Sequence, residues 1–297
     1  MLKRSLYITT PHHLSVKNNQ LVLESKEDSK TKHTVPIEDL GFIILEHSQI
    51  SITIPSISIL SKAKVCIIFC DQKKMPVSTL IPFEGNNIQN EIYRLQITSS
   101  TPINKNLWKQ IIKQKITNQA KVLQAIDRPF KDLLLIAESV LSDDSRNCEA
   151  HAARLYWPRL MENSFIRNQE AEDENILFNY GYTVLRAAVS RALVGSGLLP
   201  TWGIHHHNRY NAFCLADDIM EPYRPFVDKL VFDIIHSSKE NSFLTKENKA
   251  QFIRFLADDI PIDKTTRPCM IALKQTSASL VRCYLKESKI LSLPKFK

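Results

Sequence analysis

The chain has 297 residues, of which 43% are hydrophobic and 24% are charged, as expected of a globular protein with a substantial apolar core. No apolar run reaches the roughly 20 residues that cross a bilayer, and the N-terminal MLKRSLYITT lacks a hydrophobic stretch of signal-peptide length, so we expect no membrane association and a cytoplasmic location. The formal net charge of +8, from 39 Lys and Arg against 31 Asp and Glu, favours a polyanionic partner.

Up to residue 88 the sequence has the pattern of short β-strands separated by polar turns. Its apolar segments are rich in Val, Ile and aromatic residues, which favour strands: SLYIT, QLVLES, HTVPI, GFIILE and VCIIFC. The stretch ISITIPSISILSKAK is ambiguous, because its β-branched residues suit a strand while residues 56–64 suit a short helix. We favour that helix, packed beside the sheet, and predict a small N-terminal β domain over residues 1–88.

From residue 94 onward the apolar residues recur with helical spacing. The predicted helices cover residues 106–126, 130–141, 146–161, 176–194, 211–236, 245–258 and 266–285. The fifth of these contains Pro222 and Pro225, which predict a kink or a break. Residues 89–297 are therefore predicted to form a larger all-α helical domain, so the fold class is α+β.

Residues 103–131 are strongly basic, with six Lys and one Arg against a single Asp. Two interpretations stay open for this stretch. It is either a solvated helix face or a phosphate-binding surface, because phosphate contacts dominate the affinity of proteins for nucleic acids.

The next informative stretch is SDDSRNCEAHAARLYWPRL, which covers residues 142–160. Asp143, Asp144 or Ser145 can cap a helix whose first turns contain Glu149. A carboxylate in the first turn stabilises a helix by itself, so Glu149 has a structural explanation as well as a functional one. Arg154 follows five residues later.

A third stretch, GIHHHNRYNAFCLADDIMEPYR, combines imidazoles with carboxylates over residues 203–224. We expect a helix to start near residues 210–213. Asp218 and Glu221 are three residues apart and share one face of it, whereas Asp217 points about 100° away and is expected to face solvent. One imidazole with carboxylate oxygens suits Mn²⁺ or Mg²⁺ better than structural zinc, although a solvated helix face explains the carboxylates equally.

In combination these motifs closely resemble the metal-dependent integrase and endonuclease of CRISPR adaptation, the Cas one (Cas1) family, in its type II form. The family motifs read EAHAARLY from Glu149, GIHH from Gly203 and DIMEPYRP from Asp218. The N-terminal EDLGFIILEHSQISITIPSISILSKAKVCIIFCD also resembles the family's strand–helix–strand segment. The resemblance therefore covers nearly the whole chain, and it implies a small N-terminal β-sandwich-like domain followed by the helical domain.

The resemblance also implies the site. Glu149, His206 and Glu221 would be the ligands of Mn²⁺ or Mg²⁺, and Asp218 would be a nearby catalytic carboxylate that orients a ligand or a water molecule. His206 is preferred to His205 because it occupies the last position of G-x-x-H. The candidates for DNA contact are His205, Arg154, Arg209 and Arg224, of which Arg224 can equally pair with Asp218 or Glu221.

The activity that the resemblance implies is the insertion of foreign DNA as new spacers into a CRISPR array. A 3′-hydroxyl attacks a phosphodiester and displaces another 3′-oxygen, and with water as the nucleophile the same site acts as a nuclease. The implied partners are double-stranded DNA (the prespacer and the CRISPR repeat), a second copy of the chain in a homodimer, and the Cas two (Cas2) protein, whose dimer bridges two such homodimers.

Other interpretations stay open beside this one. The positive charge and the Lys-rich helices also suit a non-catalytic DNA-binding module, and the carboxylates also suit a metal-dependent nuclease that acts in repair without integration. A zinc hydrolase is a weaker alternative, because the sequence contains neither HExxH nor a C-x-x-C pair. We expect the six cysteines to be reduced thiols.

Overall fold

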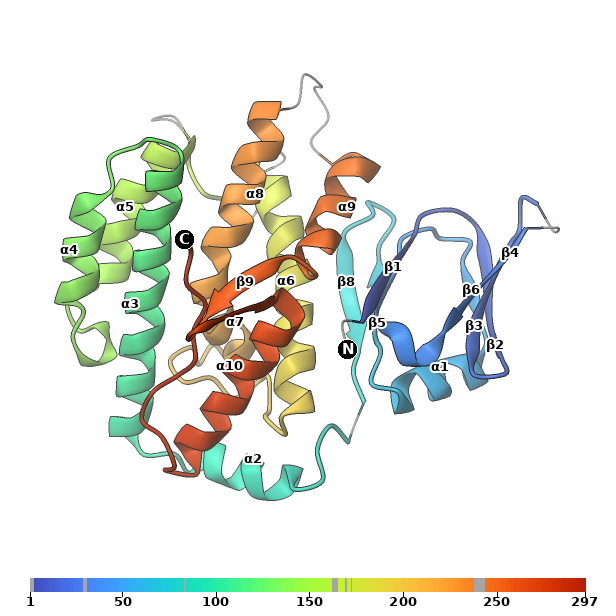
Figure 1. Cartoon of the computed structure of the whole chain (residues 1–297), viewed down its shortest axis with the longest axis horizontal. Helices are drawn as coiled ribbons and strands as arrows, with labels where there is room; N and C mark the ends of the chain where they lie inside the picture. Colours follow the sequence, from blue (N-terminus) through green and yellow to red (C-terminus); the bar gives the residue numbers. More distant parts are fainter. Residues whose placement is uncertain are drawn as a thin grey trace. The chain divides into compact units, whose positions relative to one another are not determined.

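The computed structural model describes residues 3–28, 31–82, 84–161, 165–168, 170–171, 173–237 and 244–297. The chain forms two compact units, Met1–Gly85 and Asn86–Lys297 (Figure 1). The sequence pattern placed this boundary at residue 88.

The described part of the N-terminal unit contains two four-stranded sheets. In the first, three parallel strands are followed by an antiparallel one, in the order β1 (Arg4–Ile8), β5 (Leu40–Leu45), β7 (Cys66–Cys70) and β8 (Pro76–Leu80). The second has the order β4 (Lys32–Pro36), β3 (Gln20–Ser25), β2 (His12–Lys17) and β6 (Ser51–Ile52). A short 3₁₀ helix, η1 (Ile37–Asp39), leads into β5.

The two sheets share one apolar core, which confirms the sandwich-like prediction. All six residues of β5 (LGFIIL) are buried, as in a central strand that is covered on both faces. Leu14 and Leu21 of the second sheet lie in the same buried cluster as Leu40 and Ile43 of the first. The helix α1 (Ile54–Lys62) adds Leu60 to this cluster, so the later part of the ambiguous stretch is a helix, as predicted, while Ser51–Ile52 before it form the strand β6.

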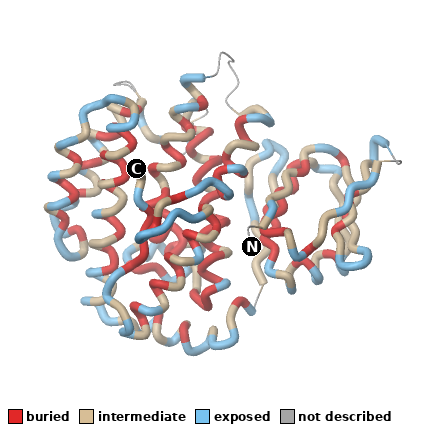
Figure 2. Tube along the Cα trace, viewed as in Figure 1, coloured by how far each residue is buried: buried red, intermediate tan, exposed pale blue. Residues whose placement is uncertain are grey.

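The second unit is mainly helical. Its helices are α2 (Gln89–Ile97), α3 (Thr101–Ala125), α4 (Lys131–Ser139), η2 (Ser142–Asp144), α5 (Cys148–Met161), α6 (Asn175–Gly195), α7 (Cys214–Met220), η3 (Glu221–Tyr223), α8 (Arg224–Ser237), α9 (Lys246–Phe255) and α10 (Cys269–Tyr284). The two longest, α3 and α6, pack against most of the others: α3 contacts α4, α5 and α8, and α6 contacts α7 to α10. Figure 2 shows buried residues following the inner faces of these helices.

One prediction for the helical domain is confirmed and another is wrong. The expected break at Pro222 and Pro225 is present, because α7 ends at Met220 and α8 begins at Arg224. The prediction of an all-α domain was wrong at one place, where β9 (Asp259–Ile262) and β10 (Thr265–Pro268) form an antiparallel hairpin. Asp263 has a φ of 50° in the turn between them, a conformation that Asp tolerates better than most residues. The α+β class is confirmed.

None of the helices in the described residues is long and apolar enough to cross a membrane. All six cysteines are free thiols.

Candidate metal centre

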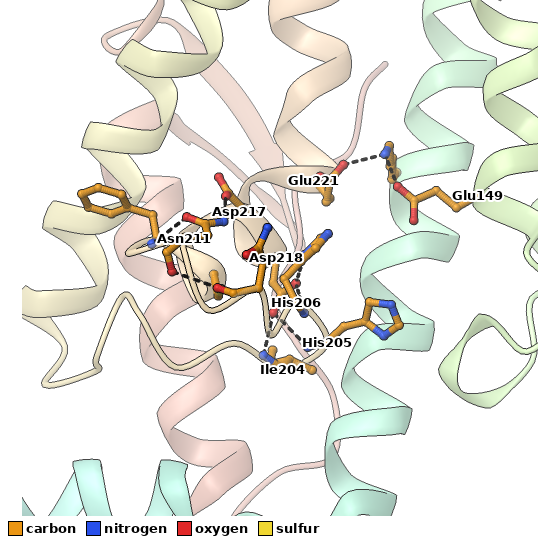
Figure 3. Close-up of polar contacts among 12 residues, drawn as sticks. Glu149, Ile204, His205, His206, Asn211, Asp217, Asp218 and Glu221 are labelled. Atoms are coloured by element: carbon orange, nitrogen blue, oxygen red, sulfur yellow. Dashed lines mark hydrogen bonds and ion pairs between the residues drawn. The ribbon is translucent and has the colours of Figure 1, made fainter. Parts of the chain in front are cut away.

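Two of the three expected metal ligands converge on a lysine. Glu149 lies in the first turn of α5 and Glu221 opens η3, and Figure 3 shows their side chains directed toward one another. The Nζ of Lys115, in the middle of α3, lies 2.6 Å from Oε1 of Glu149 and 2.5 Å from Oε2 of Glu221. The contact with Glu149 is a hydrogen bond, whereas the contact with Glu221 is an ion pair by distance that lacks hydrogen-bond geometry. A single cationic group therefore bridges both carboxylates.

The turn before α5 fixes the position of Glu149. Oδ1 of Asp144 accepts the backbone N–H of Cys148 and Oδ2 accepts that of Glu149, each at 2.9 Å. Of the three capping residues that the sequence left open, Asp144 makes these bonds. A helix has unsatisfied N–H groups at its start, so this carboxylate both ends the turn and orients the first residues of α5.

Asp218 organises the histidine loop. It is fully buried in α7. Its Oδ2 accepts the backbone N–H groups of Ile204 at 2.6 Å and His205 at 3.0 Å, and its Oδ1 lies 3.3 Å from the N–H of His206 and 2.5 Å from Nδ1 of the same residue. An ionised carboxylate only accepts, so Nδ1 of His206 carries the proton and Nε2 of the neutral ring has a free lone pair.

The electrostatic setting of His206 matches this geometry. The hydrogen bond to Asp218 raises the pKa of His206, burial opposes the rise, and the negative charges of Glu221 and Glu149 add to it. His206 therefore lies within electrostatic reach of both glutamates.

Gly203 lets the loop turn back on itself. A Cβ added there would lie 2.3 Å from the carbonyl oxygen of His206 and 3.0 Å from Oδ2 of Asp218. Any side chain at this position would collide with the backbone of the loop and press on the carboxylate that holds it. The glycine of the G-x-x-H motif is thus required for packing.

His205 has a different environment from His206. Its ring is stacked flat on Trp108, with ring centroids 4.3 Å apart and an interplanar angle of 1°, and its Nδ1 lies 3.5 Å from Oδ1 of Asp143. Its side chain remains 42% exposed. His206 meets the same tryptophan edge-on, at 5.6 Å and 87°. Trp108 and Asp143 therefore orient His205 separately from the ring that Asp218 holds.

A second cation holds the other oxygen of Glu221. Nε of Arg224 lies 2.9 Å from Oε1 of Glu221, and its guanidinium lies over the ring of Tyr182, 4.6 Å from the centroid. Burial raises the pKa of Glu221, but the charges of Arg224 and Lys115 outweigh burial, so the pKa lies below its usual value. Of the two roles expected for Arg224, the structure shows the ion pair with Glu221.

A buried carboxylate lies behind this arginine. Asp228 of α8 accepts hydrogen bonds from the hydroxyl groups of Tyr156, at 3.0 Å, and Tyr182. Burial raises the pKa of Asp228 to about 6, although both hydrogen bonds act in the opposite direction. Tyr182 thus connects Asp228 to Arg224, and through it to Glu221.

The expectation that Asp217 faces solvent was wrong. Its side chain is buried, with Oδ1 2.7 Å from Nε of Arg186 and Oδ2 accepting from Nδ2 of Asn211 at 2.7 Å. All seven residues of α7 are buried, so both faces of this short helix contact protein. The helical wheel separated Asp217 from Asp218 correctly but could not show that both sides are covered.

The remaining candidates for DNA contact lie at the surface. Arg154 and Arg209 are exposed, and Arg209 stacks over the ring of Tyr210, with its guanidinium 4.6 Å from the centroid. Tyr210 is itself 80% exposed.

Lys115 is the site residue that sequence reasoning missed. It belongs to the basic stretch 103–131, where it was one lysine among six. The position of Lys115 on the helix could have indicated its role: it is four residues after Ile111 and four before Gln119, both of which are buried on α3. A lysine at the spacing of a buried face indicates a paired charge.

One turn further along α3, Asn118 anchors the segment that carries Glu221. Its Nδ2 donates to the carbonyl oxygens of Pro222, at 2.7 Å, and Pro294, at 3.1 Å, and its Oδ1 accepts from the N–H of Phe296 at 3.0 Å. This buried carboxamide therefore joins α3, η3 and residues 294–296.

The donor set fits a hard divalent cation. It comprises two carboxylates that already share a cation and an imidazole whose Nε2 is free, a combination that suits Mn²⁺ or Mg²⁺. In the described parts of the chain, however, no three His, Cys, Asp or Glu side chains stand close enough to bind a metal ion without moving.

Comparison with known proteins gives consistent matches. The family described as CRISPR associated protein Cas1 matches residues 6–256. The chain is 36% identical over 297 residues to the CRISPR-associated endonuclease Cas1 of Neisseria meningitidis serogroup C (strain 8013), covering 99% of this chain and 96% of the relative.

Several solved structures share the fold. A casposase bound to integration product has a TM-score of 0.80 at 18% identity and covers 100% of this chain and 93% of its own. A Cas6-RT-Cas1--Cas2 complex has a TM-score of 0.73 at 18% identity and covers 97% of this chain and 35% of its own.

Proposed function

Because the chain belongs to the CRISPR associated protein Cas1 family, we propose that it is a divalent-metal-dependent DNA integrase and endonuclease that inserts DNA fragments as new spacers into a CRISPR array. The observation that carries the proposal is the meeting of Glu149 and Glu221 around one cationic group, beside a histidine with a free Nε2. This arrangement supplies oxygen and nitrogen donors without a thiolate, as phosphodiester chemistry with Mn²⁺ or Mg²⁺ requires.

The reaction exchanges one phosphodiester for another. The 3′-hydroxyl oxygen of the incoming strand forms a bond to phosphorus, the bond to the 3′-oxygen of the array strand breaks, and the hydroxyl proton passes to the departing oxygen through solvent. With water as the nucleophile the same exchange is hydrolysis. When bound, Mn²⁺ or Mg²⁺ supplies Lewis-acid stabilisation of the negative charge at the phosphoryl group.

The side chains of the protein have separate tasks in this proposal. Glu149, Glu221 and His206 would hold the cation, and Asp218 keeps the His206 ring in the tautomer that a ligand needs. The exposed His205, Arg154 and Arg209 would contact DNA phosphates, for which a guanidinium offers a planar set of donors.

The partners are part of the same proposal. The fold shared with a Cas6-RT-Cas1--Cas2 complex supports Cas2 as a partner, and the net charge of +8 supports double-stranded DNA. We propose a homodimer, two of which are bridged by a Cas2 dimer, in a type II system.

The test is a strand-transfer assay with labelled short duplexes that end in 3′-hydroxyl groups and a supercoiled plasmid that carries a CRISPR repeat. It is run with Mn²⁺, Mg²⁺ or EDTA, and with or without Cas2. The wild type is compared with His206→Ala and Glu149→Gln, and His207→Ala serves as the control because His207 is an exposed residue of the same loop. We expect metal-dependent joining that is lost in the first two variants and retained in the control.

Other outcomes separate the alternatives. Cleavage without joining, with and without Cas2, indicates a repair nuclease. DNA binding that Glu149→Gln leaves intact, with no product from the wild type, indicates a binding module. If joining survives His206→Ala and is lost in His205→Ala, the function holds and His205 is the ligand.

A further inference from the structure

Lys115 occupies the place between two carboxylates that a divalent cation would take. Its side chain is 13% exposed, and its Nζ approaches one oxygen of each glutamate. Metal–oxygen distances for Mg²⁺ are about 2.0–2.1 Å. The two ammonium contacts, at 2.6 and 2.5 Å, exceed that distance by only about half an ångström each, so a divalent cation would need only a small shift of each carboxylate.

We propose that Lys115 is a built-in counter-ion, which holds Glu149 and Glu221 together in the metal-free protein and competes with the divalent cation for them. The ammonium leaves this position when the metal binds, so Lys115 sets the metal affinity of the site. This inference rests on the proposed function, because it concerns the same site, but its test measures binding without DNA.

The two cations on Glu221 differ in how firmly they are held. Arg224 forms an ion pair with one oxygen of Glu221, although its Nε lacks hydrogen-bond geometry, and its guanidinium lies over the ring of Tyr182, which is itself hydrogen-bonded to Asp228. Among the described residues, the ammonium of Lys115 has only the two glutamates as ion-pair partners. Lys115 is therefore the cation that can be displaced.

The chemistry of the side chain agrees with this assignment. A lysine carries a compact charge on a flexible four-carbon stem, so the ammonium can move several ångströms without a change in the helix. Without a cation between them, the buried carboxylate of Glu221 and the partly exposed carboxylate of Glu149 would repel each other. The lysine thus keeps the ligands in place for the metal.

The experiment measures Mn²⁺ binding by electron paramagnetic resonance of the free ion, at one pH, with the full chain and no DNA. Lys115→Met removes the competing charge and keeps an extended side chain. Lys113→Met is the matched control, because Lys113 lies on the same helix and is exposed. Thermal unfolding with and without Mn²⁺ is recorded for each protein.

We expect Lys115→Met to bind Mn²⁺ about 10- to 100-fold more tightly than the wild type, the range that corresponds to one hydrogen bond to a charged group. The variant should also unfold at a lower temperature without metal and gain more from Mn²⁺ than the wild type does. Lys113→Met should match the wild type in both measurements.

Unchanged or weaker binding by a folded Lys115→Met protein would overturn the proposal, because it would show that the lysine does not compete. If that variant does not fold, Lys115→Arg decides instead. The guanidinium of an arginine binds carboxylates more firmly than an ammonium does. Weaker Mn²⁺ binding by Lys115→Arg than by the wild type therefore supports competition, and equal or tighter binding overturns the proposal.

The two proposals fail in different ways. If neither the wild type nor any variant binds Mn²⁺, both are overturned. If Lys115→Met binds Mn²⁺ more tightly while the wild type joins no DNA with Cas2 present, the counter-ion proposal holds and the integrase proposal is refuted.

Discussion

Replacing Asp218 by Asn is expected to change which nitrogen of His206 carries the proton. The variant is nearly isosteric, and its amide oxygen can still accept the N–H groups of Ile204 and His205. Its NH₂ group would then face Nδ1 of His206, where the carboxylate oxygen lies 2.5 Å away in the wild type. Because two donors cannot bond each other, the ring must move its proton to Nε2, the atom that the metal needs.

The magnitude follows from the bond that is lost. A hydrogen bond to a charged group contributes about 1.5–3 kcal/mol. That energy corresponds to a 10- to 100-fold loss, which is also the usual effect of changing a residue that orients a metal-binding histidine. We therefore expect Asp218→Asn to weaken Mn²⁺ binding by about 10- to 100-fold and to reduce strand transfer by a similar factor.

The assay combines Mn²⁺ titration with ¹⁵N NMR of histidine-labelled protein, which distinguishes the two tautomers. Asp217→Asn is the matched control, since it removes the same charge from the adjacent residue, whose partners are Arg186 and Asn211. We expect the control to keep Mn²⁺ affinity within about twofold. Binding by Asp218→Asn within the same limit, with Nε2 protonated, would refute the role of Nε2 as a ligand.

Two further predictions concern stability. Gly203→Ala should lower the free energy of unfolding of the helical unit by about 1–3 kcal/mol, because its Cβ would lie 2.3 Å from a backbone oxygen. Gly195→Ala is the control, because a Cβ added at Gly195 would have nothing within 4 Å; this variant should raise the free energy of unfolding by up to about 1 kcal/mol. Both values are measured by urea titration, and equal effects of the two variants would contradict the packing argument. Asp228 has a pKa raised from 3.8 to about 6, so its contribution to stability is complete below pH 3.8 and is lost as the pH rises through 6. An Asn at this position does not titrate, so Asp228→Asn should not lose stability over this pH range. The free energy of unfolding of the variant minus that of the wild type should therefore rise by about 3 kcal/mol between pH 4 and 7. A difference that does not depend on pH would show that the pKa of Asp228 is not raised.

Much of the fold follows from local patterns in the sequence. The helix α1 was predicted over residues 56–64 and spans Ile54–Lys62; its start is fixed by Thr53, whose side chain accepts the N–H of Ser56, a cap that the sequence analysis did not use. The hairpin β9–β10 was missed because each strand has only four residues, and four residues do not separate an alternating pattern from the start of a helix.

The site residues also differ in how far the sequence alone could identify them. Glu149, His206 and Glu221 stand in motifs that are continuous in sequence, so they could be named without a structure. Lys115 was not named: its spacing on the buried face of α3 indicates a paired charge, but only its partners from α5 and η3 identify it as a site residue. Such partners come from tertiary packing, which a pattern along one helix does not contain.

Asn118 also bears on the order in which the site is completed during synthesis. A nascent chain that ends at residue 237 already contains both glutamates, His206 and Lys115, yet the Asn118 carboxamide still lacks Pro294 and Phe296. A buried polar group without partners costs about 1–3 kcal/mol. At roughly 5–20 residues per second, several seconds separate translation of Glu221 from that of Phe296. We therefore expect the segment that carries Glu221 to be held less firmly until residues 294–296 have been made.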